Sequence, residues 1–75
     1  MHKSGDIRAE VAGQVIALHV EAGARCEAGQ ELLVVEAMKM EIPVLLDDAV
    51  RIVTWHVAPG DMVHEGQLLA SVEPA

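Results

Sequence analysis

The chain has 75 residues, a net charge of −7 at pH 7, 52% apolar residues and a single aromatic residue, Trp55. This length allows one small domain, and the apolar fraction argues against a disordered chain. The acidic balance, with five Lys and Arg in total, argues against a nucleic-acid partner. No apolar run approaches about 18 residues and no apolar leader precedes the domain, so we expect a cytoplasmic protein without a membrane partner.

The first part of the chain predicts two strands separated by two turns. A β-branched run over residues 15–20 indicates the first strand, and a turn follows at Gly23, where glycine can adopt a positive φ. A second turn at Gly29 precedes another apolar run. Alternation in that run is imperfect, because Leu32 and Val35 would point to opposite faces of a regular strand. A bulge, a strong twist and burial of both faces are all consistent with this pattern.

Residues 36–40, which read Glu-Ala-Met-Lys-Met, follow directly and precede an apolar run whose Pro43 indicates an edge strand or a strand start. Two interpretations of Lys39 are open. Within a strand, Met38 and Met40 would share the buried face, and Lys39 would be an ordinary solvated lysine on the other. Alternatively, Lys39 lies at or near a hairpin tip between two strands, where its amine is set apart for covalent modification.

The second half of the chain repeats the first. After a shift of 37 positions, residues 13–36 align with residues 50–73 without a gap, and eight of 24 aligned positions are identical. Chance would give about one or two identities at average residue frequencies. The identical pairs are His19/His56, Val20/Val57, Gly23/Gly60, Gly29/Gly66, Gln30/Gln67, Leu32/Leu69, Val35/Val72 and Glu36/Glu73. We therefore predict a single domain, residues 1–75, with internal two-fold pseudosymmetry and the lysine hairpin, residues 36–41, between its halves.

Each half has the same plan of strand, turn, short stretch, turn and strand, and neither shows sustained helical periodicity. The sequence therefore predicts an all-β domain of about eight short strands arranged as two facing sheets. The two-fold relation matches position 39 to a place just beyond the C-terminus. We therefore expect Lys39 and the chain ends to lie at opposite poles of the domain.

The segment with Glu36, Ala37, Met38, Lys39 and Met40 resembles the biotin-attachment signature of biotinyl domains, which occur in biotin carboxyl carrier proteins. The resemblance covers nearly the whole chain. It implies a flattened β-barrel of two four-stranded sheets in which Lys39 carries biotin in amide linkage and Ala37, Met38 and Met40 form the flanking motif. It also offers Glu36 as a carboxylate that a ligase reads. A structural role for Glu36 is equally open, because its repeat mate is followed by no lysine.

The same resemblance implies three partners. Biotin protein ligase would attach the cofactor, and biotin would then carry carboxylate from a biotin carboxylase site to a carboxyltransferase site. The chain would be a non-catalytic carrier component of a biotin-dependent carboxylase. A lipoyl carrier is an alternative, although the lysine of lipoyl domains usually follows an Asp and lacks paired methionines. An unmodified relative, such as the barrel-like domain of membrane-fusion adaptors, is another, but those domains have a long helical hairpin between their halves.

Several other residues are interpreted as structural. His19 and His56 are repeat mates, and no metal-ligand spacing links them to the other histidines, so we predict no metal site. Cys26 aligns with a valine in the second half, which indicates a small buried residue rather than a nucleophile. Val50 stands where members of the resembled family usually have glycine, and the geometry of that turn is therefore not predicted.

Overall fold

The computed structural model describes residues 5–75, in which every regular element is a β-strand. In chain order the strands are β1 (Gly5–Arg8), β2 (Gly13–Leu18), β3 (Arg25–Cys26), β4 (Glu31–Ala37), β5 (Met40–Leu45), β6 (Val50–Trp55), β7 (Met62–Val63) and β8 (Leu68–Pro74). All of their pairings are antiparallel. Over this range there is no helix long and apolar enough to cross a membrane.

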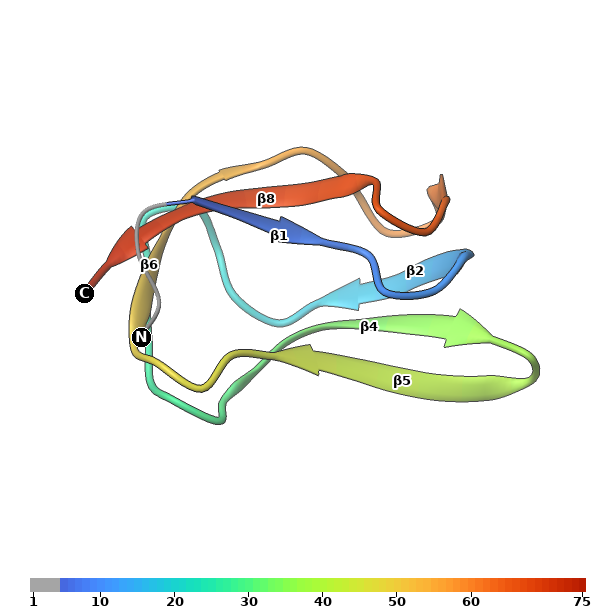
Figure 1. The fold of residues 1–75 in the computed structure, drawn as a ribbon, viewed down its shortest axis with the longest axis horizontal. Helices are drawn as coiled ribbons and strands as arrows, with labels where there is room; N and C mark the ends of the chain where they lie inside the picture. Colours follow the sequence, from blue (N-terminus) through green and yellow to red (C-terminus); the bar gives the residue numbers. More distant parts are fainter. Residues whose placement is uncertain (1–4) are drawn as a thin grey trace.

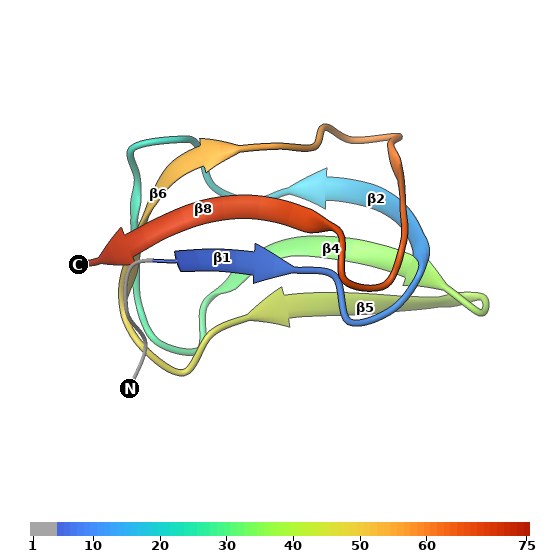
Figure 2. The same ribbon diagram turned by 45° about the horizontal axis from the view of Figure 1, so that its top comes forward.

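The strands form two four-stranded sheets that face each other (Figure 1, Figure 2). Their orders are β1-β8-β6-β3 and β5-β4-β2-β7. The predicted all-β fold of two facing sheets is therefore confirmed, and Pro43 lies in β5, an edge strand, as its missing N–H requires. The edges β1 and β5 do not pair with each other, and a groove of about 420 Å³ with largely apolar lining separates them. The structure is thus a flattened sandwich that is open along one side.

The internal repeat is visible as a two-fold relation between the sheets. The bounds of β2, β3 and β4 become those of β6, β7 and β8 when 37 is added to each residue number. Hydrogen bonds between the halves obey the same relation: Gly23 N donates to Ile52 O at 2.7 Å, and Gly60 N donates to Val15 O at 2.7 Å. Each half therefore satisfies backbone groups of the other, and neither can complete its sheet alone.

Bulges resolve the imperfect alternation seen in the sequence. Between β2 and β4 the pairing passes from Val15–Val35 to Ala17–Val34 and skips Ile16, and between β6 and β8 it skips the repeat mate, Val53. A further irregularity in β4 lets Leu32 and Leu33 both point inward, with exposed fractions of 1% and 0%. Of the explanations that the sequence left open, the bulge is therefore the one that the structure shows.

The core is aliphatic and is shared by both sheets. Its largest fully buried side chains include Leu32, Leu33, Ile52 and Leu69, and none of the buried residues within 5–75 is polar or charged. Cys26 has no exposed surface, which confirms that it is a small buried residue. Burial, together with the charge of the neighbouring Glu27, raises the pKa of the Cys26 thiol, because both disfavour the thiolate.

The two halves differ where β2 and β6 begin. Val50 opens β6 with 1% of its surface exposed and pairs with Cys26 on one side and Pro74 on the other, so the strand starts normally without glycine. At the matching position, a Cβ added to Gly13 would lie 2.3 Å from the carbonyl oxygen of Glu36. Gly13 therefore allows β2 to approach β4 close to the end that carries Lys39.

We expect Gly13→Ala to lower the free energy of unfolding by about 1–3 kcal/mol, because the backbone of β4 must move to accept the methyl group. Urea denaturation measures this loss, and amide hydrogen exchange should rise in β4. Gly23→Ala is the control: it is strained by a φ of 90° but meets no atom within 4 Å, so exchange in β4 should rise only by the amount that its own loss of global stability predicts, whereas Gly13→Ala should exceed that amount. A stability change within about 0.5 kcal/mol for Gly13→Ala would contradict the close approach.

Candidate functional site

Lys39 lies in the turn of the β4–β5 hairpin. The last paired residues of the hairpin are Ala37 and Met40, so the loop consists of Met38 and Lys39 alone. The turn is at one end of the long axis of a molecule measuring 32 × 20 × 19 Å, while the start of β1 and the end of β8 lie toward the other (Figure 1). Lys39 is therefore a turn residue, and the alternative of a lysine on a strand face does not describe the structure.

The backbone of this turn is strained. Met38 and Lys39 have φ values of 52° and 64°, and they are the only non-glycine residues with positive φ among residues 5–75. A two-residue loop with positive φ at both positions has the sign pattern of a type I′ turn, which normally contains Asn-Gly or another residue pair that tolerates this conformation. Each L-residue held there costs about 1–2 kcal/mol. Six paired positions between β4 and β5 impose the conformation.

The side chains at the tip separate into an anchored base and an exposed end. Ala37 is 6% exposed and belongs to the interior, whereas Met38 and Met40 are 82% and 61% exposed. Lys39 is also exposed. The amine is therefore presented to solvent between two apolar side chains that are themselves mostly exposed. A rigid base and an open tip suit a side chain that another protein must reach.

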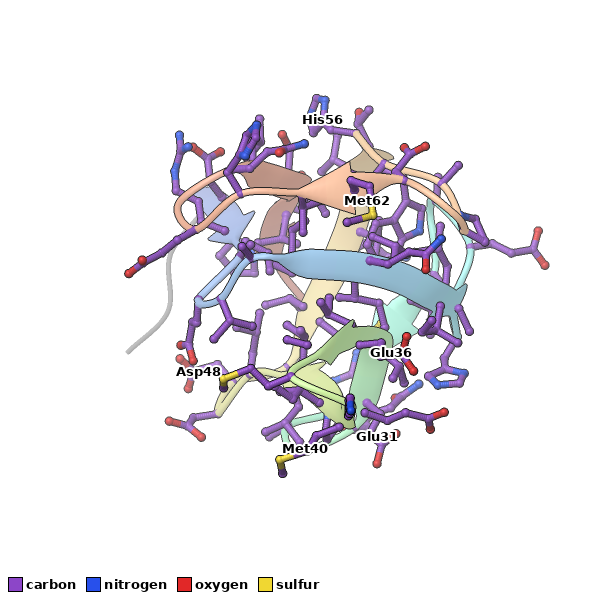
Figure 3. All side chains as sticks on the ribbon, turned by 90° about the vertical axis from the view of Figure 1, so that its right-hand side faces the viewer. Glu31, Glu36, Met40, Asp48, His56 and Met62 are labelled. Carbon is purple, nitrogen blue, oxygen red and sulfur yellow. The ribbon has the colours of Figure 1, made fainter. Side chains whose placement is uncertain are left out.

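Glu36 lies one pair below the turn, in a setting that its repeat mate does not share. Across the strands it is opposite Gln14 in β2 and opposite Glu41 in β5, so a like charge faces it on one side. In the second half, the pair that corresponds to Gln14 and Glu36 is Arg51 and Glu73, whose Nε and Oε2 atoms are 3.9 Å apart. The second copy is thus compensated by a cation, while the carboxylate near Lys39 remains exposed beside another acid (Figure 3).

The sequence did not single out Glu41 as part of this site. The pairing of Glu41 with Glu36 across the hairpin depends on a register that only the fold supplies. The left-handed conformation of Met38 also has no sequence signal, since neither Asn nor Gly marks the turn.

The histidines and other possible metal ligands do not converge. His19 lies 3.9 Å from Glu31, and the Nε2 atom of His56 is 3.0 Å from the hydroxyl oxygen of Ser71 on the outer surface. Within residues 5–75 no group of three or more His, Cys, Asp or Glu side chains could hold a metal ion. His2 lies outside the described residues.

A two-fold symmetric sandwich with an exposed lysine on a two-residue hairpin is the arrangement expected of a carrier-type domain. Residues 2–49 match the family of biotin and lipoyl attachment domains, described as "Biotin-requiring enzyme". The chain is 40% identical to the biotin/lipoyl attachment protein of Bacillus subtilis over 60 residues, which span 80% of this chain and 82% of the relative. It is 37% identical to a biotinylated protein TB7.3 homolog of Mycobacterium leprae, covering 89% of this chain and 94% of the relative.

A solved structure extends the comparison to a carboxylase. The whole chain superposes on part of a single-chain, multi-domain long-chain acyl-CoA carboxylase with a TM-score of 0.91 and 35% identity. The matched part is 8% of that protein. The chain belongs to the biotin/lipoyl attachment family, and it is a biotinyl domain homologous to the carrier domains of biotin-dependent carboxylases.

We expect Met38→Asn to raise the free energy of unfolding by about 0.5–1 kcal/mol, because asparagine tolerates positive φ better than methionine. Urea denaturation gives the difference. Met62→Asn is the matched control, since Met62 is 69% exposed but lies in β7 without a positive φ, where asparagine should bring no gain. Equal effects at the two positions would show that the turn stores no strain.

Proposed function

We propose that Lys39 is the residue that carries biotin, through an amide bond between its Nζ atom and the carboxyl group of the cofactor. The observation that carries this proposal is the hairpin itself: it places one exposed amine at the tip of a rigid turn in a chain of the biotin-requiring family. The flanking residues Ala37, Met38 and Met40 complete the motif. The tip is open, so that biotin protein ligase can reach the amine without unfolding the domain.

As a carrier, the domain would serve a biotin carboxylase and a carboxyltransferase in turn. Bound biotin would supply the carboxylate chemistry, while the protein would supply position and reach. The start of β1 and the end of β8 lie away from the hairpin, so a tether to partner proteins would leave Lys39 unobstructed (Figure 2). Tethering of this kind keeps local concentrations at about the millimolar level without tight docking. We infer that residues 1–75 act as one domain in the cytoplasm, with no role for nucleic acid or a membrane.

A lipoyl carrier is the second candidate, because the family includes lipoyl attachment domains. Two features favour biotin. The residue before Lys39 is Met38 rather than the Asp usual in lipoyl domains, and a second exposed methionine, Met40, follows. A direct comparison of biotin protein ligase and lipoate ligase on the same chain distinguishes the two functions.

The attachment site can be tested by mass, because the chain has only two lysines, Lys3 and Lys39. Incubation with biotin protein ligase, biotin and ATP should add one biotinyl group to the wild-type chain and to Lys3→Arg, and none to Lys39→Arg. Arginine keeps the charge but cannot form the amide under these conditions. Intact-mass spectrometry measures the product. If Lys39→Arg still gains the group, or if no ligase modifies the wild type, the proposed site is wrong.

Because Glu36 is exposed and has no paired cation across the strands, whereas Glu73 is paired with Arg51, we expect the ligase to depend on Glu36 and not on Glu73. We expect Glu36→Gln to lower the initial rate of biotinylation about tenfold, because a charge-assisted contact to the ligase is lost. Glu73→Gln, at the compensated position of the other sheet, should leave the rate within about twofold. The rates come from timed intact-mass measurements, with circular dichroism confirming that both variants fold. Equal rates for the two variants would assign Glu36 a structural role only.

A further inference from the structure

The exposed methionines beside Lys39 are unusual, since methionine is normally a core residue. Three methionines in residues 5–75 expose most of their side chains: Met38 at 82%, Met40 at 61% and Met62 at 69%. The first two flank Lys39. Met62 is exposed to a similar degree, but it lies in β7, which β2 separates from β4, and in Figure 3 it is well apart from Met40. The chain thus contains an internal control for thioether reactivity.

We propose that Met38 and Met40 form a redox-sensitive modification site, at which oxidation by a hydroperoxide slows the attachment of biotin to Lys39. This inference rests on the proposed function of Lys39. A sulfur lone pair attacks one peroxide oxygen, the O–O bond breaks, and a sulfur–oxygen bond forms. One thioether and one H₂O₂ give one sulfoxide and one water, so that the sulfur is oxidised by two electrons and the peroxide is reduced by two. Sulfoxide reductases restore the thioether with two thiols, which become a disulfide while the sulfoxide oxygen leaves as water.

The geometry explains why oxidation at these positions should affect Lys39. The loop has only two residues, so an active site that encloses the Nζ atom must also cover Met38 and approach Met40. Apolar thioethers can be covered at little cost. A sulfoxide carries a strong acceptor oxygen, and its burial without a donor disfavours the complex with the ligase.

The buried thiol does not compete for the oxidant. Cys26 is fully buried, and the raised pKa of its thiol reduces the fraction of thiolate, which is the form that reacts with peroxide. The exposed thioethers are therefore the first accessible sulfur atoms in the described part of the chain.

The test treats the biotin-free chain with H₂O₂, removes the peroxide with catalase, and only then adds biotin protein ligase, biotin and ATP. Tandem mass spectrometry locates the sulfoxides, and intact mass gives the biotinylation rate. We expect sulfoxides at Met38 and Met40 and a rate at least about tenfold below that of the untreated chain. Methionine sulfoxide reductases A and B with dithiothreitol should restore the rate.

Three variants separate the hairpin from other sites of oxidation. Each is compared with its own untreated sample, so that any effect of the substitution on the basal rate cancels. Met62→Leu should keep the tenfold loss, whereas the double variant Met38→Leu/Met40→Leu should show a treated-to-untreated ratio near one. Cys26→Val, which copies the valine of the other half, should behave like the wild type.

The results that overturn the inference differ from those that overturn the proposed function. An unchanged rate after confirmed oxidation of Met38 and Met40, an equal loss in the double variant, or oxidation of Met62 while the hairpin stays unoxidised would each reject the redox site. All of these leave biotinylation of Lys39 intact. No biotinylation of the untreated chain would instead reject the proposed attachment function, and with it the inference.

Discussion

The exchange of backbone hydrogen bonds between the two halves is the constraint on which the rest of the structure depends. Gly23 donates to a carbonyl of β6, and Gly60 donates to the equivalent carbonyl of β2. A chain of this size buries only about 60% of the surface of its unfolded state, so its hydrophobic core is small and its stability is marginal. Interlocking both halves around one aliphatic core makes every strand contribute to the same cooperative unit. The β4–β5 hairpin is rigid because β4 is paired within that unit.

The rigidity of the hairpin determines what its turn can hold. Two L-residues with positive φ would relax in an isolated two-stranded hairpin, which is marginally stable at best. Here β4 is paired on both sides, with β2 and β5, and its inward side chains Leu33 and Val35 are almost fully buried. The core therefore fixes β4, the ladder fixes β5, and the loop must close the remaining gap with Met38 and Lys39. Strain at the tip is a consequence of order in the body.

The sequence predicts the symmetric features of this structure better than the asymmetric ones. The repeat predicts the paired strands, because Leu32/Leu69 and Val35/Val72 must fill equivalent core positions in both sheets. It does not predict which residues a bulge skips, since Ile16 is as apolar as its neighbours and only the register exposes it. The proposal that Lys39 is the attachment site came from the Met-Lys-Met motif and its resemblance to a family. Its left-handed turn and the acid pair across the hairpin depend on register, which composition and periodicity do not specify.

The residues proposed for function lie where the symmetry of the two halves is broken. In β4, Glu36 is paired with Gln14 on one side and with Glu41 on the other. Its repeat mate in β8, Glu73, is paired with Arg51. The first residue of β2 is Gly13, which lets β2 lie close to β4. The first residue of β6 is Val50, whose side chain is buried in the core. Gly13 and Gln14 lie beside the end of β4 that leads to Lys39, whereas their counterparts Val50 and Arg51 lie beside the end of β8. The two-fold repeat supplies the paired strands of both sheets, whereas the β4–β5 hairpin with its exposed lysine occurs at one end of the described sandwich.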